Sequence, residues 1–97
     1  MKITTNNQVI DAWAHGHDAR NHRGTLVARA GELYSYRLKI GQRTTSGACI
    51  VADYTARGEY YSQTTSCHVG RARAQADMVM HPKVWKTSPL SNEELPF

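Results

Sequence analysis

The chain has 97 residues, enough for one globular domain with a modest core, and 40% of them are hydrophobic. This composition excludes a largely disordered protein, and no apolar run approaches the roughly 20 residues of a membrane-spanning helix. Twelve Lys and Arg oppose eight Asp and Glu, a formal net charge of +4, and eight of the twelve cations are arginines. Arginine pairs bidentately with phosphate and carboxylate, so the bias favours an anionic partner, although such a charge also serves solubility alone.

The first predicted element is a short amphipathic helix within "TTNNQVIDAWAHG". Val9, Ile10 and Trp13 recur at helical spacing, Thr and Asn residues before them can cap the helix, and Gly16 can end it. The segment "HDARNHRGT" that follows is expected to be a polar connector.

From residue 25 the hydrophobic period changes to that of β-strands. The segment "TLVAR" predicts a short strand, residues 30–32 a turn, and "LYSYRLKIG" a strand that is apolar at even positions and polar at odd ones. The segment "ACIVADYTA" is apolar on both faces, as in a central strand. A fourth strand is expected at residues 60–63, after a turn at residues 56–58.

The second helix is predicted in "SCHVGRARAQADMVMH", ended by Pro82, because apolar residues recur there at spacings of three and four: Val69, Ala72, Ala76, Val79 and Met80. Residues 83–97 are expected to form an extended C-terminal tail that packs along its own domain or reaches a neighbouring subunit. The predicted fold is therefore a single α+β domain over residues 1–82, a small antiparallel β-sheet with an N-terminal and a C-terminal helix, assembled at least as a dimer.

Catalytic, metal and disulfide chemistry are all disfavoured by the residue pattern. Ser66, Cys67 and His68 are adjacent and so point in different directions, and carboxylates that could orient a histidine base are scarce. The histidines around Gly16 match no zinc signature. Two cysteines and no secretory signal pattern in "MKITTNNQVI" indicate reduced thiols and a cytoplasmic location. We therefore expect no catalytic residue, no metal, no cofactor and no membrane contact.

Hydroxyl residues gather where the predicted fourth strand meets the second helix, and two interpretations are open. Thr64, Thr65 and Ser66 either only end a strand and cap the helix, or they also capture an anion. One capping hydroxyl suffices, and the others could donate to a phosphate that the helix N-terminus already favours. His68 and Arg71, one turn apart, would add donors on one edge.

Nucleic acid is the competing partner. The arginines of the second helix lie on opposite sides, which disfavours reading of DNA, and no helix-turn-helix signature precedes it. RNA or a single strand could instead contact the sheet face through Arg37, Lys39 and nearby tyrosines. The alternative function is thus a small nucleic-acid-binding accessory protein, which is possible but not favoured.

Residues 5–80 resemble small phage proteins in which an "LYSY" strand is followed by a "TTSxH" turn into a helix. The most specific parts are "YSY" at 34–36 and "TTSCH" at 64–68. On these segments the chain is similar to the phage sponge proteins of the first Thoeris anti-defence family, and the C-terminal tail lies outside the resemblance.

This resemblance implies a non-catalytic anti-defence protein of the host-cell cytoplasm that sequesters a cyclic nucleotide immune signal. The signal would be a cyclic ADP-ribose isomer, and some relatives also hold cyclic oligonucleotides in a hexamer, with pockets between subunits. The match supports seven ligand-binding residues: Tyr34, Ser35, Tyr36, Thr64, Thr65, Ser66 and His68. Arg37 and Arg71 are added on their chemistry alone, as donors to phosphate.

Overall fold

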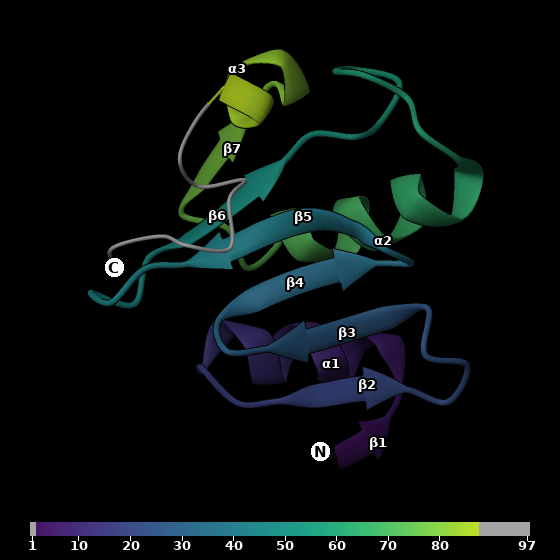
Figure 1. Cartoon of the computed structure of the whole chain (residues 1–97), viewed down its shortest axis with the longest axis vertical. Coiled ribbons are helices and arrows are strands. Elements are labelled where there is room, and N and C mark those ends of the chain that lie inside the picture. Colours follow the sequence, from purple (N-terminus) through teal and green to yellow (C-terminus); the bar gives the residue numbers. More distant parts are fainter. Residues whose placement is uncertain (1, 88–97) are drawn as a thin grey trace.

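The computed structural model describes residues 2–87 (Figure 1). Within this range the elements are β1 (Lys2–Thr4), α1 (Asn6–Ala14), β2 (Ala19–Asn21), β3 (Leu26–Arg29), β4 (Glu32–Ser35), β5 (Leu38–Arg43), β6 (Cys49–Ala52), α2 (Gln63–Arg73), β7 (Met78–Met80) and α3 (Pro82–Thr87). They form one compact α+β domain, so the predicted fold class is confirmed at that level.

The seven strands of the described range form one sheet, and their order in the sheet is their order in the chain, β1 to β7. Strands β2 to β6 pair antiparallel with their neighbours, whereas β1 pairs parallel with β2 and β7 parallel with β6. A parallel pair needs a crossover connection, and here α1 and α2 supply the two crossovers. The sheet is therefore mixed, and the prediction of a wholly antiparallel sheet was wrong.

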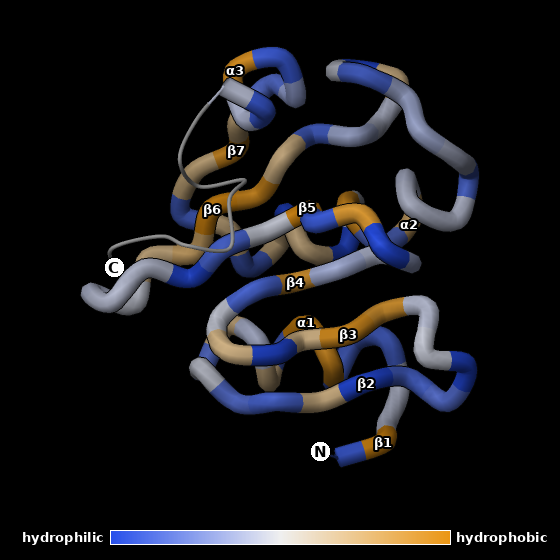
Figure 2. The backbone as a smooth tube through the Cα atoms, viewed as in Figure 1, coloured by the Kyte–Doolittle hydropathy of each residue, from blue (hydrophilic) through white to orange (hydrophobic). Residues whose placement is uncertain are grey.

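Helices α1 and α2 contact each other on one face of the sheet (Figure 1). The apolar stripe of α1 is fully buried against the strands, with Val9, Ile10 and Trp13 at most 2% exposed. The Trp13 Nε1–H donates to the Gly31 carbonyl at 2.9 Å. In Figure 2 the strongly hydrophobic segments fall mainly on α1 and on strands such as β3 and β6. The core thus lies between this helical layer and the sheet.

The second helix differs from its prediction at both ends. Helix α2 begins at Gln63, because the Ser62 hydroxyl accepts from the Thr65 backbone N–H at 3.1 Å and caps it. Residues 60–62 are therefore a loop before the helix, and the fourth strand expected at residues 60–63 was wrong. The helix ends at Arg73, and residues 78–80 form strand β7 beside β6 instead of a last helical turn.

Pro82 begins a helix and does not end one, which suits its fixed φ and missing N–H. Helix α3 occupies the first residues of the segment expected to be extended, and its Trp85 is 1% exposed within the main core. The Lys86 ammonium also pairs with the Glu59 carboxylate at 2.5 Å. The rest of the predicted tail, residues 88–97, lies outside the described residues. None of the helices in residues 2–87 is long and apolar enough to cross a membrane.

Candidate functional site

The turn between β4 and β5 holds a bulky residue in an unfavourable backbone conformation. Tyr36 has a φ of 58°, in the left-handed region, and its side chain is 47% exposed. An L-residue there costs about 1–2 kcal/mol, and two-residue hairpin turns that need a positive φ usually employ Gly, Asn or Asp. The Tyr36 N–H donates to the Thr25 carbonyl at 2.7 Å, which holds the turn in place. Strain of this kind gathers at ligand sites, so the turn is a candidate site.

The loop between β2 and β3 reaches the same place and is fixed by the side chain of Asn21. Its amide nitrogen donates to Asn6 Oδ1 and to Thr25 Oγ1, both at 2.8 Å, and its oxygen accepts from the backbone N–H groups of Thr25 and Leu26. Because one buried amide makes all four bonds, the loop is a rigid platform. It carries Arg23 to the side of the turn.

Two adjoining pockets open beside this turn, and we call them together the groove. The inner pocket, of about 380 Å³, includes His68 in its wall, and the outer pocket, of about 720 Å³, includes Arg37 and Tyr61. The two share four residues: Arg23, Thr25, Tyr36 and Thr64. The described residues that line the groove include two arginines and no Asp or Glu. Ser62 and Thr64, at the N-terminus of α2, form one wall, so the helix dipole adds to the positive potential.

A chain of buried polar groups lies directly behind the groove. Ser35 Oγ is 3.0 Å from Thr65 Oγ1 and 2.7 Å from His68 Nδ1, and all three residues are at most 1% exposed. Burial lowers the pKa of His68 below its ordinary value, and the nearby Arg71 charge lowers it further, so the ring is neutral near pH 7. Since Ser35 is fully buried, its hydroxyl is enclosed in the domain and ties β4 to α2.

Four of the predicted ligand-binding residues line the groove, namely Tyr36, Arg37, Thr64 and His68. Two more, Ser35 and Thr65, lie behind it as members of the buried chain. The hydroxyl of Thr65 is therefore bonded within the domain, and the cap of α2 is Ser62, two residues before the first of the three hydroxyls considered from sequence. Of those three, Thr64 is exposed in the groove and available to a ligand.

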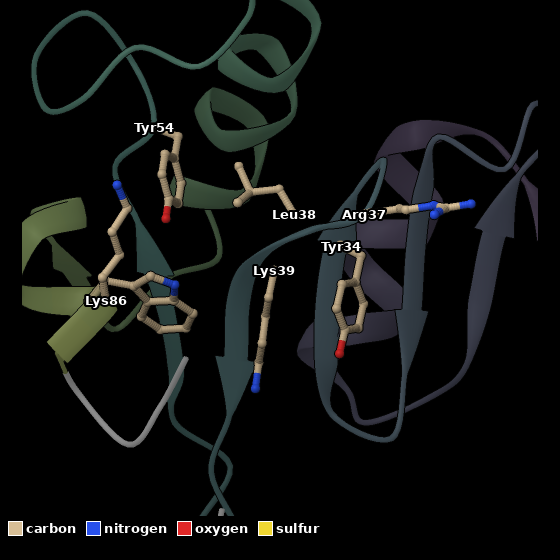
Figure 3. Close-up of a pocket in the computed structure, with 7 residues that line it drawn as sticks. Tyr34, Arg37, Leu38, Lys39, Tyr54 and Lys86 are labelled. Carbon is tan, nitrogen blue, oxygen red and sulfur yellow. The ribbon is translucent and has the colours of Figure 1, made fainter. Parts of the chain in front are cut away.

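The remaining three predicted residues lie elsewhere. Ser66 is half-buried within α2, and Arg71 turns toward α1, where its Nη1 donates to Asn7 Oδ1 at 2.6 Å. Tyr34 is on the sheet face opposite Ser35 and paired in register with Lys39. It lines a separate pocket of about 350 Å³ that Arg37, Leu38, Lys39, Tyr54 and residues of α3 complete (Figure 3). The structure thus does not bring these three residues into the groove.

Sequence reasoning missed Arg23, Thr25 and Tyr61, which line the groove. The first two lie in the segment expected to be a polar connector, and Tyr61 lies in the segment expected to be a strand. The signal that could have found the loop is the group Asn21, Arg23 and Gly24, because Asn and Gly bracket a tight turn that presents the residues between them. Gly24 has a φ of 72°, as such a turn requires.

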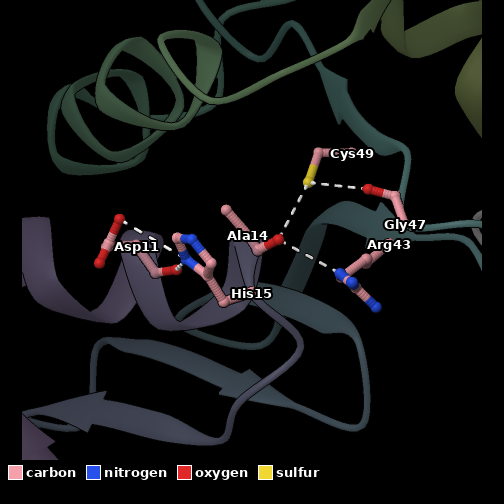
Figure 4. A network of polar contacts seen from close by, with 6 residues as sticks. All are labelled: Asp11, Ala14, His15, Arg43, Gly47 and Cys49. Atoms are coloured by element: carbon pink, nitrogen blue, oxygen red, sulfur yellow. Dashed lines mark hydrogen bonds and ion pairs between the residues drawn. The ribbon is translucent and has the colours of Figure 1, made fainter.

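The polar cluster at the end of α1 has a structural explanation (Figure 4). Arg43 Nε donates to the Ala14 carbonyl at 3.2 Å, and the Cys49 thiol contacts the same carbonyl oxygen, so the last turn of the helix is satisfied. Burial raises the pKa of Cys49, which keeps its thiol protonated. His15 contacts Asp11 one turn earlier. Within residues 2–87 no three His, Cys, Asp or Glu side chains converge as metal ligands would.

Comparisons with protein-family models, with curated proteins and with solved structures found no match for this chain. The groove is therefore the main structural indication of what the protein binds.

Proposed function

We propose that the protein is a non-catalytic binding protein that holds a small phosphate-bearing nucleotide in the groove. The observation that carries this proposal is the lining of the two adjoining pockets by Arg23, Arg37, Tyr36 and Tyr61, with no carboxylate among their described residues. Two guanidinium groups match a doubly charged ligand, and two exposed tyrosine rings match a nucleobase.

Different residues of the groove would bind the phosphate and the base. Arg23 lies between the two pockets and pairs with phosphate oxygens, while the α2 N-terminus and the Thr64 hydroxyl add neutral donors. Tyr36 and Tyr61, 47% and 57% exposed, present ring surface on which a base can stack, and Tyr61 is supported by an edge contact with the Tyr54 ring. The fixed loop and the hydrogen-bonded turn hold these groups before the ligand arrives, which reduces the entropy lost on binding.

The biological role that fits such a site is sequestration of a cyclic nucleotide immune signal by a phage protein. The resemblance described from sequence favours a cyclic ADP-ribose isomer, and a cyclic oligonucleotide is the next candidate. A sponge needs complementarity to the ground state of its ligand, so it requires no acid, base or nucleophile. The groove is open, and a second subunit placed over it would enclose the ligand, as expected for a homo-oligomer.

The test is native mass spectrometry and calorimetry with a panel of cyclic nucleotides, followed by release of the ligand on heating. We expect intact ligand to be recovered, and Arg23→Gln to weaken binding about 10- to 100-fold, the loss of one charge-assisted contact. Arg57→Gln is the matched control, because Arg57 is exposed and belongs to neither pocket of the groove. A cleaved product, or equal effects of the two substitutions, would refute the proposal.

A second candidate, binding of single-stranded nucleic acid, is favoured by one observation. The Tyr36–Arg37 turn also borders a hollow of about 300 Å³ on the open sheet face, together with Arg29 and Tyr34. A strand crossing the turn could stack on both tyrosines. The salt dependence of binding separates the two candidates: affinity for a polyanion falls steeply with salt, whereas a nucleotide with two phosphates in the groove gives a shallow slope.

A further inference from the structure

Within residues 2–87, only one nitrogen of the His68 ring has a hydrogen-bond partner. Its Nδ1 is bonded to Ser35 Oγ at 2.7 Å, and the residue is 1% exposed yet lines the inner pocket. Every fully enclosed side-chain nitrogen and oxygen in residues 2–87 has a hydrogen-bond partner. Because Nε2 has no partner among the described residues, it is not fully enclosed, and we infer that it faces the inner pocket, which His68 lines.

The buried hydroxyls decide which nitrogen carries the hydrogen. If Thr65 donates to Ser35 and Ser35 donates to His68 Nδ1, every hydroxyl hydrogen in the chain has an acceptor, and Nε2 must carry the N–H. In the reverse direction the Thr65 hydroxyl would have to donate to a further group, and Ser35 is its one hydrogen-bond partner among the described residues. A buried donor without an acceptor is strongly unfavourable, so the first arrangement is preferred.

We propose that Thr65 and Ser35 fix His68 in the tautomer with hydrogen on Nε2, so that a neutral N–H donates to an anionic oxygen of the ligand in the inner pocket. This inference rests on the proposed function, and it predicts the orientation of the ligand in the groove. The inner pocket, between His68 and Arg23, takes one phosphate, and the outer pocket takes the base on its tyrosine rings, with Arg37 beside it for a second anionic group. In this scheme Ser35 and Thr65 are positioning residues, since they act on the ligand only through His68.

The chain also links the two parts of the site. Ser35 directly precedes the strained Tyr36, and Thr65 directly follows the exposed Thr64. The Tyr36 ring centroid lies 6.5 Å from that of His68. The hydrogen bonds of Ser35 therefore hold the turn and the head of α2 at a fixed separation, which sets the width of the inner pocket.

The experiment is long-range ¹H–¹⁵N correlation spectroscopy of the side-chain histidines in the ¹⁵N-labelled full chain at neutral pH. His68→Gln identifies the His68 signals by their loss. We expect Nδ1 without hydrogen and Nε2 with hydrogen before any ligand is added, and a saturable shift of the Nε2 signal on titration with pyrophosphate as the probe. In Ser35→Ala we expect a mixture of tautomers and about 3- to 10-fold weaker pyrophosphate binding, the loss of one oriented hydrogen bond. Thr65→Val, which keeps the side-chain shape, should also mix the tautomers and serves if Ser35→Ala does not fold.

The outcomes separate this inference from the proposed function. Hydrogen on Nδ1 in the unaltered protein, or unchanged tautomers in Ser35→Ala and Thr65→Val, would overturn the role of the hydroxyls. Saturable pyrophosphate binding that leaves the Nε2 signal unmoved would overturn the donor role of His68 and leave the groove as the binding site. Failure of both pyrophosphate and the nucleotide panel to bind would overturn the proposed function and the donor role of His68 together. The tautomer measurement would still decide whether Thr65 and Ser35 fix the hydrogen on Nε2.

Discussion

The strain at Tyr36 can be measured by two truncations that differ only by a β-carbon. Tyr36→Ala and Tyr36→Gly both remove the ring, and both lose the roughly 100 Å² that a half-exposed tyrosine buries, about 2.5 kcal/mol. At a φ of 58° the alanine retains a penalty of about 1–2 kcal/mol that glycine does not have, while the flexibility of glycine in the unfolded chain costs about 0.5–1 kcal/mol. The glycine variant should therefore be more stable than the alanine variant by about 0.5–1 kcal/mol, whereas at most positions alanine is the more stable of the two.

Urea unfolding followed by tryptophan fluorescence gives the comparison, since Trp13 and Trp85 are both buried. The matched control is Arg37→Ala against Arg37→Gly, one residue along the same turn, where φ is not positive and alanine should be the more stable. An alanine variant at position 36 that is as stable as the glycine variant would show that the turn is unstrained and would remove this reason for regarding it as a site. Both truncations should also weaken nucleotide binding about tenfold, and Tyr36→Phe should not, because stacking requires only the ring.

Three further predictions concern packing and protonation. Gly41→Ala should destabilise the protein by about 1–3 kcal/mol, because a β-carbon there would lie 2.8 Å from a Trp13 ring carbon. Gly70→Ala should instead stabilise it by about 0.5–1 kcal/mol, because a β-carbon at that helical position has no neighbour within 4 Å. Similar urea midpoints for the two variants would contradict the described core. Trp85→Ala should cost about 3–5 kcal/mol, and an unchanged midpoint would mean that α3 is not part of the domain. The pKa of His68 is lowered in the folded state, so the unfolded chain takes up the proton first, and stability present above pH 6.5 is lost as the pH falls below it. His68→Gln should flatten that slope in urea titrations across this range, and an equal slope would show that His68 is not buried as described.

The elements that sequence reasoning found are those with a long local pattern. The stripe of Val9, Ile10 and Trp13 is the buried face of α1. The alternation in "LYSYRLKIG" correctly indicated β-structure, but the single strand predicted there was wrong, because a turn at residues 36–37 divides the segment into β4 and β5. Strands β1, β2 and β7 have three residues each, too few to show a period, and two of them pair parallel with strands reached through a helix. Val79 and Met80 continue the helical spacing by coincidence, so the strand β7 was taken for the end of α2.

The site was predictable only in part, for a related reason. Tyr36 was predicted from the resemblance at "YSY", and Thr64 and His68 from the hydroxyl cluster at the start of the second helix and the resemblance at "TTSCH". Arg23 reaches the groove only through the pairing of β2, β3 and β4, and that pairing cannot be seen from "HDARNHRGT" alone. Tyr34 and Ser35 were predicted together from the resemblance, but consecutive strand residues point to opposite faces of a sheet, so only one of them can serve a given pocket.

The strand order of the sheet has a consequence for how the domain forms. Because every strand lies beside its predecessor, no strand has to be inserted between two that are already paired. The antiparallel hairpins around the Tyr36 turn close short loops and can assemble first, and each crossover helix then adds one outer strand at a free edge. Nascent chains would thus complete the rigid turn early and the pocket wall supplied by α2 late. In the proposed function, the protein would therefore bind its ligand only after the second half of the chain has docked.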